Sequence, residues 1–110
     1  MTPDPKGEAG KLKAPMFLLP PFALFETAWV HGLGAKKYGP YNWRENRVAT
    51  SVYISAIMRH LMAYSNGEDL DPESGRSHLA HISAGCNILM DAGHAGMLDD
   101  DRPSTTMQTL

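Results

Sequence analysis

Three histidines in this chain stand where they could hold a metal ion or a phosphate. His78 and His81 are three residues apart, so on a helix they share one face and suit two ligands of one metal or two contacts to one phosphate. His60 falls among apolar residues of an earlier helical segment, where a histidine is either a hydrogen-bonded core residue or a ligand. The His-x-x-His spacing alone is a weak motif, so these residues need partners.

Carboxylates provide candidate partners. Glu26 lies on an apolar helical face, where a carboxylate is costly unless it is paired or binds a metal, so it is either an arginine's ion-pair partner or a metal ligand. Asp91, near the end of a later helix, either faces solvent or contributes to a metal site. A loop with four acids in six residues suits Mg²⁺ or is simply solvated, and these acids are Glu68, Asp69, Asp71 and Glu73.

The segment between residues 36 and 44 combines aromatic, amide and basic side chains. Aromatic rings stack on nucleic bases, amides hydrogen-bond to base edges, and cations hold phosphates. Alternatively, the aromatic rings fix this loop onto the rest of the fold. The residues that we expect to contact a ligand here are Lys37, Tyr38, Asn42, Trp43 and Arg44.

Helices must position these groups. Apolar residues spaced by three and four predict helices over about 21–33, 50–66 and 77–93, entered at Pro21 and capped by Thr50 or Ser51 and by Ser77. No segment alternates with period two, so we predict no sheet. The stripes expected to form the core are Phe22, Phe25, Trp29 and Leu33, then Tyr53, Ile57, Leu61 and Tyr64, then Leu79, Ile82, Cys86 and Leu89.

The fold class predicted is all-α, a small bundle of three main helices with polar loops. Residues 1–15 are rich in Pro, Gly and Lys and predict a disordered arm, 16–96 form the helical domain, and the acidic segment 97–110 predicts a flexible tail. Three short helices make a thin bundle. We therefore expect a homo-oligomer to complete the core.

Composition narrows the function classes. With 10 Lys and Arg against 12 Asp and Glu, the net charge is −2, which disfavours binding of long nucleic acid but not of a single nucleotide. Cys86 is the single cysteine and cannot form an internal disulfide. No segment resembles a signal peptide or approaches the roughly 20 apolar residues of a membrane span, so we expect no membrane contact and a cytoplasmic protein.

Several unusual short sequence motifs occur together in a fixed order. They resemble the N-terminal family of phage dATP/dGTP diphosphohydrolases, and the likeness covers roughly residues 16–92. The segments that carry it are 34–43 (GAKKYGPYNW), 59–64 (RHLMAY), 67–75 (GEDLDPESG) and 77–87 (SHLAHISAGCN), after a Leu-Leu-Pro-Pro entry at 18–21.

The resemblance implies metal-dependent release of pyrophosphate from a purine deoxynucleotide, with Mg²⁺ or Mn²⁺ as cofactor, in the host cytoplasm if a phage encodes the chain. This chemistry is similar to that of the all-α MazG-like pyrophosphohydrolases, whose helices carry Glu-x-x-Glu and Glu-x-x-Asp pairs. No helix predicted here carries such a pair. Either the site uses Glu26, the acidic loop and histidines, or the chain does not hydrolyse.

The first hypothesis is therefore a nucleoside triphosphate diphosphohydrolase. Its catalytic residues would be Glu26, His60 and His78, and its metal ligands Glu26, Glu68, Asp71, Glu73 and Asp91. The residues that would bind the purine nucleotide are Lys37, Tyr38, Asn42, Trp43, Arg44, Arg59 and His81. The alternatives are a non-catalytic protein that sequesters a (cyclic) nucleotide immune signal, and a structural or adaptor bundle.

Overall fold

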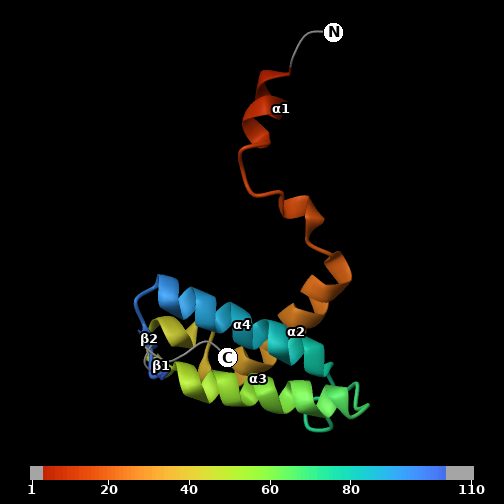
Figure 1. Ribbon diagram of the computed structural model, residues 1–110, viewed down its shortest axis with the longest axis vertical. Coiled ribbons are helices and arrows are strands. Elements are labelled where there is room, and N and C mark those ends of the chain that lie inside the picture. The colour runs from red at the N-terminus through yellow and green to blue at the C-terminus, as the bar shows by residue number, and fades with distance from the viewer. Residues whose placement is uncertain (1–3, 104–110) are drawn as a thin grey trace.

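The computed structural model describes residues 4–103, and three helices dominate them. These are α2 (Pro21–Tyr38), α3 (Thr50–Ser65) and α4 (His78–His94), which confirms the all-α prediction (Figure 1). The shorter elements are α1 (Pro5–Gly10), 3₁₀ turns at Met16–Leu18 and Asn42–Arg44, and the strands β1 (Val48–Ala49) and β2 (Leu98–Asp99). No helix among the described residues is long and apolar enough to cross a membrane.

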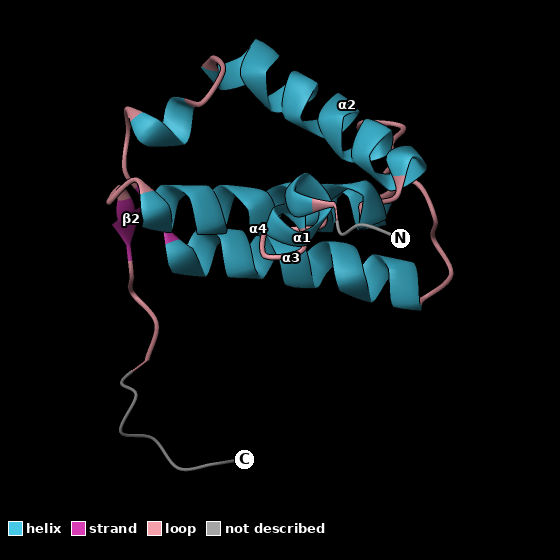
Figure 2. Cartoon of the chain, turned by 90° about the horizontal axis from the view of Figure 1, so that it is seen from above, coloured by secondary structure: helices cyan, strands magenta, loops and turns pink. Residues whose placement is uncertain are grey.

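Helices α3 and α4 form a hairpin, and α2 crosses over this pair (Figure 2). The close approach of α3 and α4 depends on small residues. Ala80, Ala84 and Gly85 are buried on α4, and a Cβ atom added to Gly85 would lie 3.0 Å from Cγ1 of Ile57 on α3. Among residues 4–103 the buried apolar cluster consists of Val30, Ala80 and Ala84, with Ala92 buried apart from it, so the hairpin and the middle of α2 share a very small core.

Helix α2 is longer than the predicted 21–33. It continues through Gly32 and Gly34, each of which costs up to about 1 kcal/mol relative to alanine, because its later turns pack against α4. Lys36 and Lys37 occupy the last turn, where positive charge is favourable, and Gly39 with φ of 91° ends the helix. The helix therefore ends at Gly39 and not at Gly32 or Gly34, where we expected it to stop.

The prediction of no sheet was wrong in one place. Strands β1 and β2 pair in parallel, with Val48 opposite Leu98 and Ala49 opposite Asp99. This pairing joins the residues before α3 to those after α4. Two-residue strands are too short to show alternation, which is why the sequence pattern did not reveal them.

The caps of the two hairpin helices differ. Ser77 accepts a hydrogen bond from the Leu79 amide at 3.1 Å and caps α4 as predicted. Neither Thr50 nor Ser51 caps α3, because both are already inside the helix. Instead Asp101 accepts hydrogen bonds from the amide of Ser51, at 2.8 Å, and from its hydroxyl. Asp101, a residue of the predicted flexible tail, thus accepts a hydrogen bond from a free backbone amide in the first turn of α3.

The predicted disordered arm contains a helix. Helix α1 spans Pro5–Gly10, but it buries none of its residues and extends away from the bundle (Figure 1). Pro5, at its first position, favours this short helix locally. The ends of the arm and tail, residues 1–3 and 104–110, lie outside the described residues, and the division into arm, domain and tail stays a prediction.

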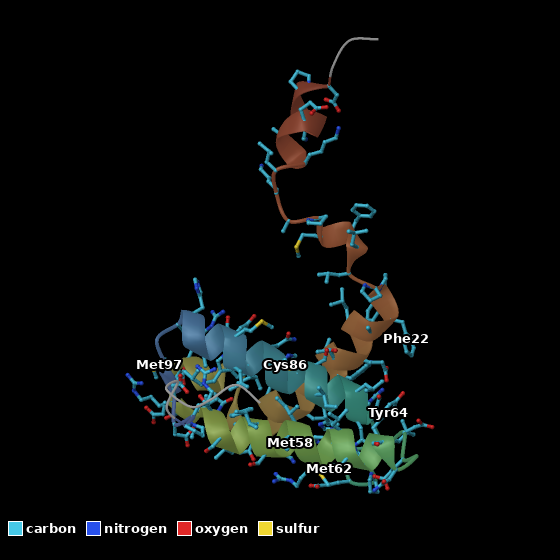
Figure 3. The ribbon with its side chains drawn as sticks, in the orientation of Figure 1. Phe22, Met58, Met62, Tyr64, Cys86 and Met97 are labelled. Atoms are coloured by element: carbon cyan, nitrogen blue, oxygen red, sulfur yellow. The ribbon has the colours of Figure 1, made fainter. Side chains whose placement is uncertain are left out.

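The predicted apolar stripe of α2 does not form the core. Phe22, Phe25 and Trp29 are 77%, 68% and 57% exposed, and Thr27 and Val30 are buried instead. Figure 3 shows Phe22 on the part of α2 that projects from the bundle, with Met58 and Met62 on α3. Leu61, Leu79 and Cys86, also assigned to the core, are exposed as well. Helices that approach on small residues leave their large ones outside.

We expect this exposed surface to be covered by further copies of the chain. A soluble monomer rarely exposes so many large apolar side chains side by side. Light scattering at micromolar concentration should give a mass at least twice that of one chain. Phe22→Glu with Phe25→Glu should lower that mass while leaving the helical circular dichroism unchanged. A wild-type chain that is monomeric and well behaved would contradict this expectation.

Candidate functional site

Three side chains converge from α3, from the loop after it and from α4. His60, Asp71 and His81 each place one potential ligand atom within 4.8 Å of the other two, and the two imidazole rings stack at 4.4 Å between centroids. Among residues 4–103, this is the group of histidine and acidic side chains close enough together to hold one ion. We call it the His60–Asp71–His81 cluster.

Backbone hydrogen bonds fix the loop that supplies Asp71. Its amide donates to the Arg76 carbonyl at 2.8 Å, and its carbonyl accepts from the Gly75 amide at 2.7 Å. Gly75 has φ of 72°, a conformation that glycine adopts without strain. Ser74, which the sequence analysis did not single out, places its Oγ 2.7 Å from Nε2 of His81. The turn therefore holds Asp71 against the first turn of α4.

A chain of hydrogen bonds supports the cluster from behind. His78 is 3% exposed, and its Nε2 lies 2.7 Å from Oε1 of Glu68. Its Nδ1 lies 2.8 Å from Nδ1 of His60. Glu68, His78 and His60 thus form a continuous relay from a half-exposed carboxylate to the cluster.

The environment sets the charges of the cluster. Burial lowers the pKa of His60 and of His81. Repulsion from His78 lowers the pKa of both further, and repulsion from His60 lowers that of His81, while Asp71 acts in the opposite direction on both. Burial alone would raise the pKa of Asp71, but hydrogen bonds from the Glu73 amide and Ser74 outweigh it, so this pKa is lowered. Near pH 7 the cluster is two neutral imidazoles and one carboxylate. The 3.5 Å approach of His81 to Asp71 is therefore not an ion pair at that pH.

The cluster opens into a cleft of about 750 Å³, a size typical of small-molecule sites. Six of the seven residues predicted to bind a nucleotide line this cleft: His81, which lies there with His60 and His78, and five others. They are Lys37, Tyr38, Asn42, Trp43 and Arg59. The cleft therefore combines two cations, three groups able to contact a base, and the potential ion ligands.

Glu26 lies apart from the cluster. Its Oε2 is 3.7 Å from Nη1 of Arg76, and its side chain is 25% exposed. The Arg76 guanidinium also lies over the ring of Trp29, 4.7 Å from its centroid. Of the two interpretations of Glu26, this geometry favours the ion pair with an arginine.

Asp91 is also placed elsewhere. It accepts hydrogen bonds from Nε1 of Trp43 at 2.7 Å and from Arg44, whose Nε and Nη2 lie at 2.7 and 2.8 Å. These bonds, with Arg44 first, hold the pKa of the Asp91 carboxyl well below its usual range. Both carboxylate oxygens are thus engaged, and Asp91 anchors the loop after α2. This is the loop-fixing alternative that the aromatic residues allowed.

A second cavity of about 710 Å³ lies next to this anchor. Trp43 lines both cavities, so its ring stands between them. Asn87 and His31 both line the second cavity and contact each other, with 3.1 Å between Nδ2 of Asn87 and Nε2 of His31. Arg44 faces this cavity and not the cleft.

The two remaining predicted metal ligands have other contacts. Glu73 is 84% exposed and lies 3.9 Å from Lys37 at the rim of the cleft, and Glu68 contacts His78. Asp71 is thus the one predicted acidic ligand that lies in the cluster. His60 and His81 stand in ligand positions although the sequence suggested them chiefly for catalysis and nucleotide contact. The His-x-x-His spacing was the signal, and only the folded loop shows its partner.

We expect Asp91→Asn to weaken nucleotide binding by about tenfold, the low end for losing one stacked base. An amide carries no charge and offers one acceptor oxygen in place of two, so it holds Arg44 and Trp43 less firmly at the cleft. Calorimetry with a non-hydrolysable nucleotide measures the affinity, and Trp43→Ala should weaken it at least as much. Unchanged affinity of a folded Asp91→Asn chain would contradict the role of this anchor.

Comparisons with known proteins agree on one family. The family model of the dATP/dGTP diphosphohydrolase N-terminal domain matches residues 3–102. A protein of Salmonella phage PMBT28 named dATP/dGTP diphosphohydrolase is 31% identical over 90 residues, which are 82% of this chain and 30% of that protein. No solved structure matches the chain significantly. Because the model match covers nearly the whole chain, the chain belongs to the dATP/dGTP diphosphohydrolase N-terminal family.

Proposed function

We propose that the cleft hydrolyses a purine (deoxy)nucleoside triphosphate to the monophosphate and pyrophosphate with the help of a divalent ion. The observation that carries this proposal is the His60–Asp71–His81 cluster, which opens into a cleft that also presents the cations Lys37 and Arg59. The family match and the name of the phage relative support the substrate class. The chain spans about 30% of that relative's length, so the activity is proposed for the protein that carries this domain.

In this reaction water adds to the α-phosphorus and the bond from that phosphorus to the bridging oxygen of the β-phosphate breaks. Mg²⁺ or Mn²⁺, the ions that the family chemistry implies, would supply polarisation of the phosphate and activation of the water. Lys37 and Arg59 neutralise phosphate charge, because both line the same cleft as the cluster. The lone pairs of His60 and His81, neutral near pH 7, would hold the ion, and the proton that the attacking water releases would pass to solvent.

The base occupies the aromatic side of the cleft. Tyr38 is exposed and offers a free ring face, while Trp43 is held by Asp91. Asn42 lies beside Trp43 and supplies an amide for a base edge. A fixed ring loses little freedom on stacking, which favours Trp43 over Tyr38 as the main contact.

Incubation with the four deoxynucleoside triphosphates, ATP, GTP and cyclic dinucleotides tests the proposal. Each is supplied with Mg²⁺ or Mn²⁺, and both pyrophosphate release and ligand retained after gel filtration are measured. We expect pyrophosphate from purine triphosphates above that from pyrimidine ones. Tight retention without turnover would favour the sequestering protein, and neither would favour an adaptor bundle.

A further inference from the structure

We propose that His60, Asp71 and His81 bind a first-row transition-metal ion such as Mn²⁺ or Zn²⁺ in preference to Mg²⁺, and that Glu68 and His78 orient His60 for this role. The inference deepens the proposed function by naming the ion and its ligands, and it rests on that function only for what the ion is used for. Binding itself is measured without any nucleotide.

The geometry of the cluster suits one ion. The three ligand atoms lie within 4.8 Å of one another, and ligands that bind zinc at about 2.1 Å stand roughly 3.3 Å apart. The atoms therefore need to close by at most about 1.5 Å, which small side-chain rotations allow. The backbone of each ligand is already held, by α3, by the Asp71–Arg76 turn and by α4.

The donor set selects the kind of ion. Mg²⁺ prefers oxygen ligands and retains several waters, whereas imidazole nitrogens suit zinc and its first-row neighbours. Two imidazoles and one carboxylate make up the ligands of the cluster. Catalytic zinc sites use three protein ligands of this kind and leave a further position for water or substrate. Zn²⁺ is thus the best match to this donor set, and Mn²⁺, the weakest binder of the first-row series, stands between Zn²⁺ and Mg²⁺.

The relay behind the cluster fixes the proton on His60. The Glu68 carboxylate accepts a hydrogen bond, so Nε2 of His78 donates to it. The same assignment gives Nδ1 of His78 the lone pair that accepts the proton of His60 Nδ1, because two donors or two acceptors cannot share one hydrogen bond. This leaves the lone pair of His60 on Nε2, the nitrogen not used by the relay. A carboxylate that orients a metal-binding histidine in this way raises the metal affinity.

Titration calorimetry on the full chain, freed of metal by a chelator, tests the proposal with Mn²⁺, Zn²⁺ and Mg²⁺ as probes. We expect one Zn²⁺ per chain, bound at least about 100-fold more tightly than Mg²⁺, and Mn²⁺ bound with an affinity between the two. Electron paramagnetic resonance of Mn²⁺ gives an independent count of bound ions. Equal or tighter binding of Mg²⁺ would overturn the choice of ion.

Variants locate the site. Asp71→Asn and His81→Asn should abolish tight binding, while Asp69→Asn in the same loop, outside the cleft lining, should bind as wild type does. Glu68→Gln should weaken binding by about 10- to 100-fold, and Glu45→Gln, an exposed control outside both cavities, should not. Circular dichroism checks that each variant is folded.

The two proposals fail separately. If the Asp71→Asn chain keeps wild-type Mn²⁺ affinity while folded, the ligand assignment is wrong, whatever the nucleotide assay shows. If Glu68→Gln binds metal as tightly as Glu45→Gln, the relay has no orienting role. Tight metal binding without nucleotide turnover would leave this site in place and overturn the hydrolytic function.

Discussion

Asp71→Asn is expected to lower pyrophosphate release by about 100-fold or more, because metal polarisation of a phosphate supplies several kcal/mol to the transition state. Asp71 is the one carboxylate in the cluster, and an amide oxygen is a weaker ligand that carries no charge. The reaction should be followed at saturating nucleotide and Mn²⁺, so that the loss appears in kcat. The melting temperature of the Asp71→Asn chain shows whether the variant is folded.

Asp69→Asn is the matched control for this prediction. It makes the same chemical change in the same loop, two residues earlier, at an exposed side chain outside the cleft lining. We expect its turnover to stay within about threefold of wild type, as for a surface substitution. Near-wild-type kcat of the Asp71→Asn chain would remove Asp71 from the reaction.

Gly85→Val is expected to give the largest loss of stability. The first carbon of the new side chain would lie 3.0 and 3.2 Å from Cγ1 and Cδ1 of Ile57, and the branched methyls would crowd it further. Overpacking of this kind costs about 1–3 kcal/mol. For a domain of this size, that loss lowers the melting temperature by about 4–20 °C. Thermal unfolding followed by circular dichroism at fixed protein concentration measures the change.

Gly93→Val controls for the change in helix propensity. Gly93 lies on the same helix, and its nearest neighbour to an added Cβ is Leu98 at an ordinary 3.9 Å. We expect this variant to unfold within about 0.5 kcal/mol of wild type. If Gly85→Val is as stable as Gly93→Val, the hairpin does not depend on close contact at Gly85.

The sequence predicted what local signals determine. The bounds of α3 and the Ser77 cap of α4 follow from nearby residues, and both are confirmed. The choice of core face was wrong because periodicity identifies an apolar face but not the partner that covers it. The large residues of α2, such as Phe25, mark that face, yet the single chain packs on Val30.

The candidate site also divides into a part that local sequence signals predicted and a part that depends on distant residues. The spacing of His78 and His81 indicated a shared face, and the structure places both beside His60. The contribution of Asp71 depends on a turn closed by backbone hydrogen bonds, which side-chain patterns do not specify. Asp91 contacts Trp43 and Arg44, which lie 48 and 47 positions away in the sequence. No local pattern could therefore show that Asp91 pairs with these residues and does not belong to the metal ligands.

The pairing of β1 with β2 gives the hairpin two unequal ends. It links Val48 to Leu98 across the whole of α3 and α4, so it joins residues far apart in the sequence. Two-residue strands protect few amides, and the pairing can open without unfolding the helices. Hydrogen exchange at Val48 should therefore be faster than in the middle of α3. This end of the hairpin lies away from His60, Asp71 and His81, so opening there should leave that cluster in place.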